Sequence, residues 1–364
     1  MEEKKNMTPA AENEYLIEVK DLVKWFPIKS SFLKRTIGNV RAVDGISFKI
    51  KRGQTMGLVG ESGCGKSTAG RTMLRLIEKT SGEVWFDGQE ISSLPKEELR
   101  KLRPRIQIIF QDPYSSLSPR IPVGEIIGEA VREHEIVAPE EYDDYISRIM
   151  RACGLQEYHK DRYPHEFSGG QRQRIGIAKA LSLNPKFIVC DEPVSALDVS
   201  IQAQILNLLK SLQKELHLTL LFVGHGLGAV NYVSDRIAVM YLGKIVEIGE
   251  AKEIFRHPVH PYTQALIEAV PVPDPEEKDR RKEFLAGEIG DSANPPMGCR
   301  FHPRCPHATP ECAKQVPELL ELAGCPGHLV ACPVMAETKP QKTGAAKAAA
   351  AGALTDQKGG RRDV

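Results

Sequence analysis

Apolar and polar residues alternate along the early part of the chain. The alternation in LIEVKDLVKWF, which begins at Leu16, and in RAVDGISFKI predicts strands of a small β unit. Later apolar runs in QTMGLVG, GEVWFDGQ, IQIIFQDP, FIVCD and TLLFV predict further strands, several of them buried. Between and after these runs the pattern becomes helical, so the sequence predicts a mixed α/β fold.

One helical stretch is long enough to form a separate unit. From Val123 to about Arg162, apolar residues recur at three- and four-residue spacing in VGEIIGEAVREHEI and EYDDYISRIMRACGL. The ends of the chain lack such periodicity, which predicts disorder there. We therefore expect the following organisation: a disordered N-terminus (1–14), a main domain (15–255) with a helical subdomain at about 97–167, a C-terminal extension (256–335), and a disordered tail (336–364).

Composition narrows the class of protein. The 364 residues are 41% hydrophobic, which is ordinary for a globular protein with a large core. The 49 basic and 48 acidic residues leave a net charge of +1, so no overall basic field supports a nucleic-acid partner. The start MEEKKNMTPAAENE has no signal-peptide apolar region, and no apolar run approaches the length of a membrane span. We therefore expect a cytoplasmic protein.

The stretch GESGCGKST predicts a nucleoside-triphosphate site. It fits G-x-x-x-x-G-K-[ST], in which glycines let backbone N–H groups wrap a phosphate chain. Lys66 would reach the β- and γ-phosphates, and the Ser67 hydroxyl would hold Mg²⁺. A strand pattern precedes the loop and a helix pattern follows it, as the motif requires. The candidate ATP-binding residues of this loop are Gly60, Glu61, Ser62, Gly63, Cys64, Gly65, Lys66, Ser67 and Thr68.

Three further segments carry candidate chemistry. FSGGQRQR predicts a second anion site, with Ser168 at the positive start of a helix. FIVCDE places Asp191 and Glu192 at a strand end, where Asp191 would hold Mg²⁺ and Glu192 would polarise a water. TLLFVGHG places His225 at the end of another strand. In open α/β sheets ligands bind at this edge, so we expect His225 to meet the same phosphate.

Together these motifs resemble the nucleotide-binding subunits of ABC transporters. GESGCGKST, Gln111, FSGGQRQR, FIVCDEP, SALD and His225 occur in that family's order and cover roughly residues 16–249. The resemblance implies an α/β, RecA-like P-loop NTPase fold, with an antiparallel β subdomain, a helical subdomain and, here, a Cys-rich C-terminal extension. It also implies an ATPase in which two subunits close head to tail over two nucleotides.

The resemblance also implies roles for single residues. Gln111 would sense the γ-phosphate, contribute with Ser67 and Asp191 to the Mg²⁺ site, and contact the coupling region. Asp198 would communicate between the two ATP sites, and Phe26 would stack on adenine, with Trp25 the weaker candidate. Four residues would bind ATP across the dimer: Ser168, Gly169, Gly170 and Gln171.

A finer resemblance points to the dipeptide and oligopeptide importer branch. FQDPYSSLSPR, DRYPHEFSGGQRQRIGIAKAL, HPYTQAL and GCRFHPRCP look like that branch, and KSSFLKRTIGN and HEFSGG are most similar to its second, F-type ATPase subunit. The implied partners are a second ATPase subunit, two transmembrane permeases and an extracytoplasmic peptide-binding protein, which would place this chain on the cytoplasmic face of the cell membrane. The family usually has Ser-His-Asp-Leu where this chain has Gly224, His225, Gly226 and Leu227, which puts the hydrolysis rate in question.

Two other functions stay open from the sequence. The same motor could move another solute, such as nickel or a sugar, because cargo is chosen by partner proteins. A soluble ABC-type ATPase acting on ribosomes or DNA is a rival from another class. Such relatives usually carry two cassettes, whereas this chain has one phosphate loop and one Ser-Gly-Gly segment.

Eight cysteines are distributed unevenly. Cys64, Cys153 and Cys190 are scattered, and we expect them to be inert, whereas five crowd between residues 299 and 332. In a reducing compartment a cluster favours metal over disulfides. Zinc, a [4Fe-4S] cluster and metal-free packing thiols all stay open, and the resemblance favours the [4Fe-4S] cluster. Its implied ligands are Cys299, Cys305, Cys312 and Cys332, with Cys325 additional.

Overall fold

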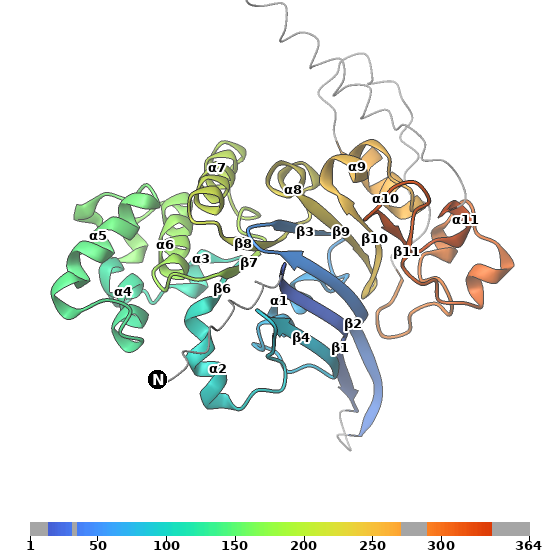
Figure 1. Cartoon of the computed structure of the whole chain (residues 1–364), viewed down its shortest axis with the longest axis horizontal. Helices are drawn as coiled ribbons and strands as arrows, with labels where there is room; N and C mark the ends of the chain where they lie inside the picture. Colours follow the sequence, from blue (N-terminus) through green and yellow to red (C-terminus); the bar gives the residue numbers. More distant parts are fainter. Residues whose placement is uncertain (1–13, 31–34, 271–289, 337–364) are drawn as a thin grey trace, which may run out of the picture.

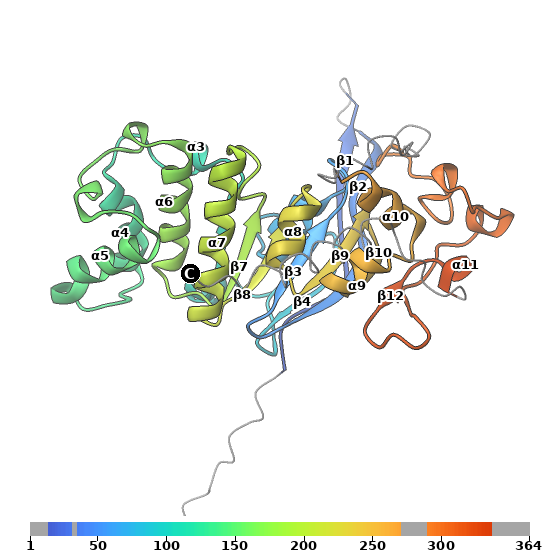
Figure 2. The same ribbon diagram turned by 90° about the horizontal axis from the view of Figure 1, so that it is seen from above.

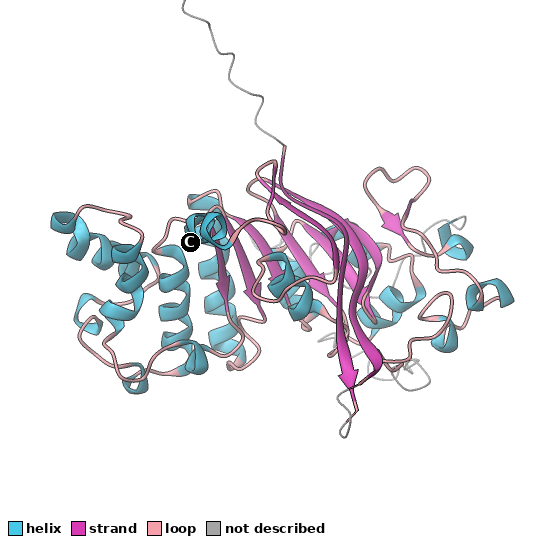
Figure 3. Cartoon of the chain, turned by 90° about the horizontal axis from the view of Figure 1, so that it is seen from below, coloured by secondary structure: helices cyan, strands magenta, loops and turns pink. Residues whose placement is uncertain are grey.

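The computed structural model describes residues 14–30, 35–270 and 290–336. Except for Glu14 and Ala336, the two ends that the sequence predicts to be disordered lie outside these residues. Figures 1 and 2 show two sheets in the middle of the molecule, the helices α4 and α5 at one end and the C-terminal extension at the other. Helices therefore flank the strands on both sides, as Figure 3 also shows.

The smaller sheet has the strand order β2-β1-β4-β5, and its strands are all antiparallel. Its two long strands form where the sequence alternates between apolar and polar residues, and one face of each is buried. The bounds are β1 (Tyr15–Lys29), β2 (Thr36–Lys51), β4 (Ser81–Phe86) and β5 (Gln89–Glu90).

The larger sheet has the order β11-β12-β10-β9-β3-β8-β7-β6. Its five strands from β9 to β6 are parallel, and β3, β7 and β8 are buried along their whole length, which explains their continuous apolar sequences. The bounds are β3 (Thr55–Val59), β6 (Ile106–Ile109), β7 (Phe187–Asp191), β8 (Thr219–Val223), β9 (Arg236–Tyr241), β10 (Lys244–Glu250), β11 (Leu320–Glu321) and β12 (Leu329–Val330).

The register of the parallel strands aligns their carboxyl ends. Val223 at the end of β8 is paired with Asp191 at the end of β7, and on its other side with Leu58 of β3. The loops that leave these three strands begin at the same edge of the sheet. They carry residues 60–68, Glu192 and His225. The fold therefore gathers the candidate site at one edge, as expected for this sheet type.

Helices complete both sides of the sheets. α4 and α5 pack with α6 in the helical part of the molecule, on a core that includes Ile126, Ile146 and Ile175. The bounds are α1 (Lys66–Met73), α2 (Lys96–Leu102), α3 (Pro113–Ser116), α4 (Val123–Glu133), α5 (Tyr142–Ala152), α6 (Gly169–Leu181), α7 (Val199–Glu215), α8 (Leu227–Val233), α9 (Ala251–Arg256), α10 (Pro261–Glu268) and α11 (Pro333–Ala336). Among the described residues no helix is both long and apolar enough to cross a membrane.

The C-terminal extension continues the larger sheet. β12 pairs with β10, opposite Glu247, and β11 pairs with β12. A small cluster of Val259, Leu322 and Val330 packs beneath it. A buried carboxylate joins the two parts, because Glu247 accepts hydrogen bonds from two backbone N–H groups and contacts His328 Nε2 at 2.7 Å. The extension is thus built onto the main domain.

Candidate ATP site

The phosphate loop connects β3 to α1 and depends on glycine. Gly60, Gly63 and Gly65 all have positive φ values, a region that side chains rarely adopt. A Cβ on Gly65 would lie 1.9 Å from the carbonyl oxygen of Ala42. The loop can therefore pass this close to β2 only with glycine at that position, and the N-terminus of α1 then faces the loop.

Lys66 is the buried cation of the loop. Its side chain is held inside the loop, where Nζ donates to the carbonyl oxygens of Gly60 at 2.9 Å and Glu61 at 3.0 Å. Cys64 is also buried, and burial raises the pKa of its thiol although Lys66 lies beside it. Ser67 and Thr68 are partly exposed in the first turn of α1. A phosphate bound here would meet one ammonium group and several backbone N–H groups.

Asp191 is fully buried at the end of β7, and its two carboxylate oxygens differ. Oδ2 accepts from Arg71 Nε at 3.1 Å, whereas Oδ1 is buried without a hydrogen-bond partner among the described residues. A buried carboxylate oxygen without a donor is unfavourable unless a cation or water fills the place. The carboxylate therefore fits Mg²⁺, with Ser67 and Gln111 as the other candidate ligands. The sequence did not single out Arg71, which lies one helical turn beyond the loop.

Gln111, Glu192 and His225 come together from three different loops. Glu192 Oε2 accepts from Gln111 Nε2 at 3.1 Å and lies 3.2 Å from His225 Nδ1. Glu192 has a φ of 47°, an unusual value for a residue other than glycine. Its N–H donates to the carbonyl oxygen of Val223 at 3.0 Å, which ties this backbone to β8. The strained backbone of Glu192 thus places its carboxylate where an amide and an imidazole both contact it.

The glycines beside His225 have different surroundings. Nothing lies within 4 Å of a Cβ placed on Gly226, whereas one on Gly224 would lie 2.9 Å from Val230 Cγ2. Gly226 is the N-cap of α8, with no side chain to cap it. The Cβ of an aspartate at 226 would therefore meet no other atom within 4 Å.

The Ser-Gly-Gly segment opens α6 at an exposed position. Ser168 Oγ accepts from Gln171 N at 3.4 Å, and Gln171 Oε1 accepts from Ser168 N at 3.0 Å, which forms a capping box. Gly169 is exposed and Gly170 is buried. Within the described residues the hydrogen bonds of Ser168 close its own helical turn, and the segment forms an exposed helix start. Anion binding at this helix start stays a prediction.

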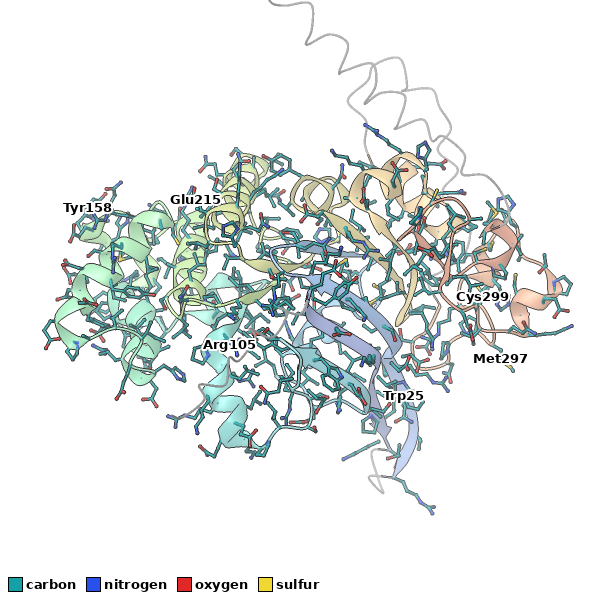
Figure 4. All side chains as sticks on the ribbon, viewed as in Figure 1. Trp25, Arg105, Tyr158, Glu215, Met297 and Cys299 are labelled. Atoms are coloured by element: carbon teal, nitrogen blue, oxygen red, sulfur yellow. The ribbon has the colours of Figure 1, made fainter. Side chains whose placement is uncertain are left out.

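The remaining candidates are spread more widely. Phe26 is partly exposed on β1, with Lys24 Nζ 4.7 Å from its ring centre. Trp25 is engaged elsewhere, since its Nε1 donates to Asp44 at 2.8 Å; Figure 4 labels it on β1. This arrangement leaves the ring of Phe26 more available for stacking than that of Trp25. Asp198 is exposed at the N-cap of α7.

The three scattered cysteines are buried, and burial raises the pKa of Cys153 and of Cys190 to about 12, as expected for inert thiols. The C-terminal cysteines behave differently. Burial raises the pKa of Cys332 to about 11, and three other thiols of the proposed ligand set add to that shift. In the parts of the chain that the structure describes, however, no three His, Cys, Asp or Glu side chains form a group that could hold a metal ion. The arrangement of the thiols in the described residues therefore gives no support to a [4Fe-4S] cluster.

Comparison with known proteins agrees with the geometry. The family model described as "ABC transporter" matches residues 43–195. The oligopeptide transport ATP-binding protein AppF of Bacillus subtilis is 52% identical over 89% of this chain and 98% of its own length, and the putative oligopeptide transport ATP-binding protein YkfD of the same species is 51% identical over 89% and 97%. The chain therefore belongs to the ATP-binding proteins of ABC transporters and is an ATPase.

A second family model narrows the class. The one described as "Oligopeptide/dipeptide transporter, C-terminal region" matches residues 246–312, so the chain falls within the oligopeptide and dipeptide branch. This match confirms the resemblance to the dipeptide and oligopeptide importer branch.

Solved structures agree with the fold. CbiO1 of Clostridium perfringens, part of an ABC transporter complex, is 31% identical with a TM-score of 0.57 and covers 67% of this chain and 91% of its own. The ATP-binding cassette MJ0796, solved as a dimer bound to ADP and Pi, is 28% identical with a TM-score of 0.58 and covers 65% and 98%. The predicted fold class is confirmed.

Proposed function

We propose that this chain is the ATP-hydrolysing subunit of an ABC importer for dipeptides or oligopeptides. The observation that carries the proposal is the presence, in one chain, of the ABC transporter region that holds the phosphate loop and of the C-terminal region of oligopeptide and dipeptide transporters. The names of its relatives support the cargo, since they are described as oligopeptide transport or peptide import ATP-binding proteins.

The geometry of the site suggests a separate role in hydrolysis for each of its residues. Lys66 and the loop N–H groups bind the β- and γ-phosphates, and Phe26 stacks on the adenine. Glu192 accepts a proton from the attacking water, and Gln111 and His225 hold that carboxylate and contact the γ-phosphate. When bound, Mg²⁺ neutralises charge on the phosphate oxygens. Asp191 and Ser67 hold it, with the amide oxygen of Gln111.

The second half of each ATP site comes from another subunit. The exposed start of α6, from Ser168 to Gln171, offers N–H groups and a helix N-terminus to a nucleotide held by a partner chain. The dimeric cassette among the structural relatives supports this arrangement. We propose that the partner is a related second ATPase, which makes the pair a heterodimer, and that Asp198 links the two sites.

Permease subunits contact the helical side of the molecule. A pocket lies between β6, α3 and α6, and its lining includes Phe110, Ser116 and Gln173. Phe110 and nearby Tyr114 are exposed aromatic residues, and both side-chain polar atoms of Gln173 are buried without partners. Exposed aromatic residues beside a pocket are typical of a protein interface. We propose that one of the two permeases docks here, which places the chain on the cytoplasmic face of the membrane, and that an extracytoplasmic protein delivers the peptide.

The [4Fe-4S] cluster stays a prediction of the family resemblance alone. Burial raises the pKa of Cys299, Cys305 and Cys332, and neighbouring thiols of the proposed ligand set add to each shift. These effects support the proximity of the thiols, and no role in hydrolysis follows from them. Anaerobic purification tests the prediction. About four irons and four sulfides per chain would support the cluster. Stoichiometric zinc would indicate a zinc site instead, and a preparation without either metal would indicate thiols that only pack.

Transport in reconstituted vesicles tests the function. The chain, a second ATPase and the permeases are placed in proteoliposomes with the binding protein outside and MgATP on the side of the ATPases. We expect uptake of a labelled peptide that unlabelled peptides inhibit and that nickel or sugars do not. Uptake inhibited only by nickel or a sugar would assign that cargo instead. ATP hydrolysis that no permease and no solute alters would favour a non-transport ATPase.

A further inference from the structure

The second residue of the phosphate loop is held from outside the loop. Glu61 N donates to the hydroxyl of Tyr262, on α10, at 2.8 Å. Its carbonyl oxygen accepts from Lys66 Nζ at 3.0 Å. Its carboxylate pairs with Arg304, which lies in a short 3₁₀ turn (His302–Arg304) of the C-terminal extension. The first turn of the loop is therefore fixed by residues that belong to the far end of the chain.

The contact between Arg304 and Glu61 has the geometry of a strong pair. Nη1 lies 3.0 Å from Oε2 and Nη2 lies 3.2 Å from Oε1, so both carboxylate oxygens accept. The Arg304 side chain is only 7% exposed, and that of Glu61 is 22% exposed. Burial opposes the charge on Arg304, but the hydrogen bonds to Glu61 and Tyr241 outweigh it and raise its pKa above the ordinary value. A pair this well shielded is screened little by solvent.

Aromatic rings fix the arginine in place. Tyr241, Tyr262 and Phe301 are all buried, and their ring centres lie 4.7 to 5.5 Å apart. Arg304 lies within 6.0 Å of two of these rings, and Nη1 also donates to the Tyr241 hydroxyl at 3.3 Å. Its Nε is buried without a partner, and among the described residues Glu61 is the carboxylate with which it pairs. The guanidinium therefore depends on Glu61 for its counter-charge.

This contact joins the two regions that the family models match separately. Glu61 lies within residues 43–195, and Arg304 lies within residues 246–312, 243 positions later. Arg304 is also flanked in sequence by Cys299 and Cys305; Figure 4 labels Cys299 in the extension. The peptide-transporter region is therefore in direct contact with the part of the loop whose carbonyl oxygens hold Lys66.

We propose that Arg304 is a positioning residue for ATP: from the C-terminal extension it holds Glu61, and through it the first turn of the phosphate loop, in the geometry that receives the nucleotide. Glu61 and the Lys66 ammonium share a hydrogen bond, so a displaced Glu61 backbone shifts the cation that meets the phosphates. The extension then sets how tightly the site binds ATP, while the groups that perform hydrolysis stay where they are.

Binding of MgATP to the full chain tests the proposal. Arg304→Met removes the charge while keeping much of the bulk, and we expect it to raise the Kd by between about 2- and 30-fold, the usual range for coupling through a neighbouring residue. Arg304→Lys keeps the charge but makes a single contact, so its Kd should lie between those of the wild type and Arg304→Met. The value of kcat at saturating ATP should stay within about twofold of the wild type, because Glu192 is unaffected.

A double-variant cycle and a matched control separate positioning from folding. In the Glu61→Gln background, Arg304→Met should add little further loss, because the route it uses is already broken. Lys314→Met breaks the exposed pair between Lys314 and Glu311 in the same extension and should leave the Kd unchanged.

Two results would overturn the proposal. One is an unchanged Kd for Arg304→Met together with a lowered Tm, which makes the contact structural only. The other is full additivity with Glu61→Gln. If Arg304→Met does not fold, Arg304→Lys replaces it, both as a single variant and in combination with Glu61→Gln. An unchanged Kd with a lowered Tm, or full additivity, would then overturn the proposal in the same way.

Discussion

Replacing Glu192 by glutamine should separate ATP hydrolysis from ATP binding. The substitution keeps the shape of a side chain that is 14% exposed and that contacts Gln111 at 3.1 Å and His225 at 3.2 Å. It removes the negative charge that would accept the proton of the attacking water. It leaves the phosphate loop untouched, and Lys66 keeps its place there. Binding should therefore survive while turnover stops.

The expected loss of hydrolysis rate in Glu192→Gln follows from the role of Glu192 as a general base. A positioned general base contributes about 10²- to 10⁴-fold to the rate, which corresponds to about 3 to 5 kcal/mol in the activation free energy. The amide of the variant can still accept a hydrogen bond from Gln111 once it is rotated, so the fold and the Tm should change little. Lys66→Ala should do the opposite, because it removes the main cation of the phosphate site and weakens binding itself.

Single-turnover hydrolysis in the assembled transporter, together with a separate measurement of the MgATP Kd, provides the assay. Glu253→Gln is the matched control, since it removes a similar Glu–His contact of 3.0 Å on α9, far from the loop in sequence; its hydrolysis should match the wild type. Normal turnover by the Glu192→Gln protein would show that another group orients the water and would refute the reasoning.

Three further predictions follow from the structure. Gly226→Asp should cap α8 and raise the free energy of unfolding by a few tenths of a kcal/mol. It should also speed hydrolysis if His225 lacks an orienting carboxylate. Gly226→Asn controls for the cap, and equal hydrolysis rates for the two variants would exclude the charge as the cause. Burial lowers the pKa of His260 to about 4, so the folded state favours the neutral imidazole. The resulting contribution to the free energy of unfolding, about 3 kcal/mol, is complete above about pH 6.5 and is lost as pH falls toward 4. His260→Asn should flatten this pH dependence in urea titrations, and an unchanged pH dependence would contradict the assignment. Gly65→Ala should abolish MgATP binding, because its Cβ would clash with the backbone of Ala42. At Gly63 a Cβ meets nothing within 4 Å, so Gly63→Ala should cost about 1 to 3 kcal/mol of backbone strain and keep binding. Equal losses of binding in the two variants would argue against the clash.

Local patterns determined much of this protein in advance. The alternation after Leu16 predicts β1 and β2, the buried runs predict β3, β7 and β8, and the glycine spacing predicts the phosphate loop. These features are readable because each depends on neighbouring residues: side-chain periodicity in strands, and positive φ values that glycine tolerates. Asp191, Glu192 and His225 also follow from the sequence, since parallel strands bring their carboxyl ends to one edge.

Tertiary structure alone decided how these parts act on one another. No pattern near Glu61 indicates that Arg304 and Tyr262 will hold it, because the partners are more than 200 positions away. The buried contact of Glu247 with His328 likewise appears only once the extension adds β12 beside β10. Long-range pairs of this kind depend on which surfaces meet during packing, and packing is a property of the whole chain rather than of any segment. The sequence determined the ATP site, and the packing of distant segments decided what holds that site in place.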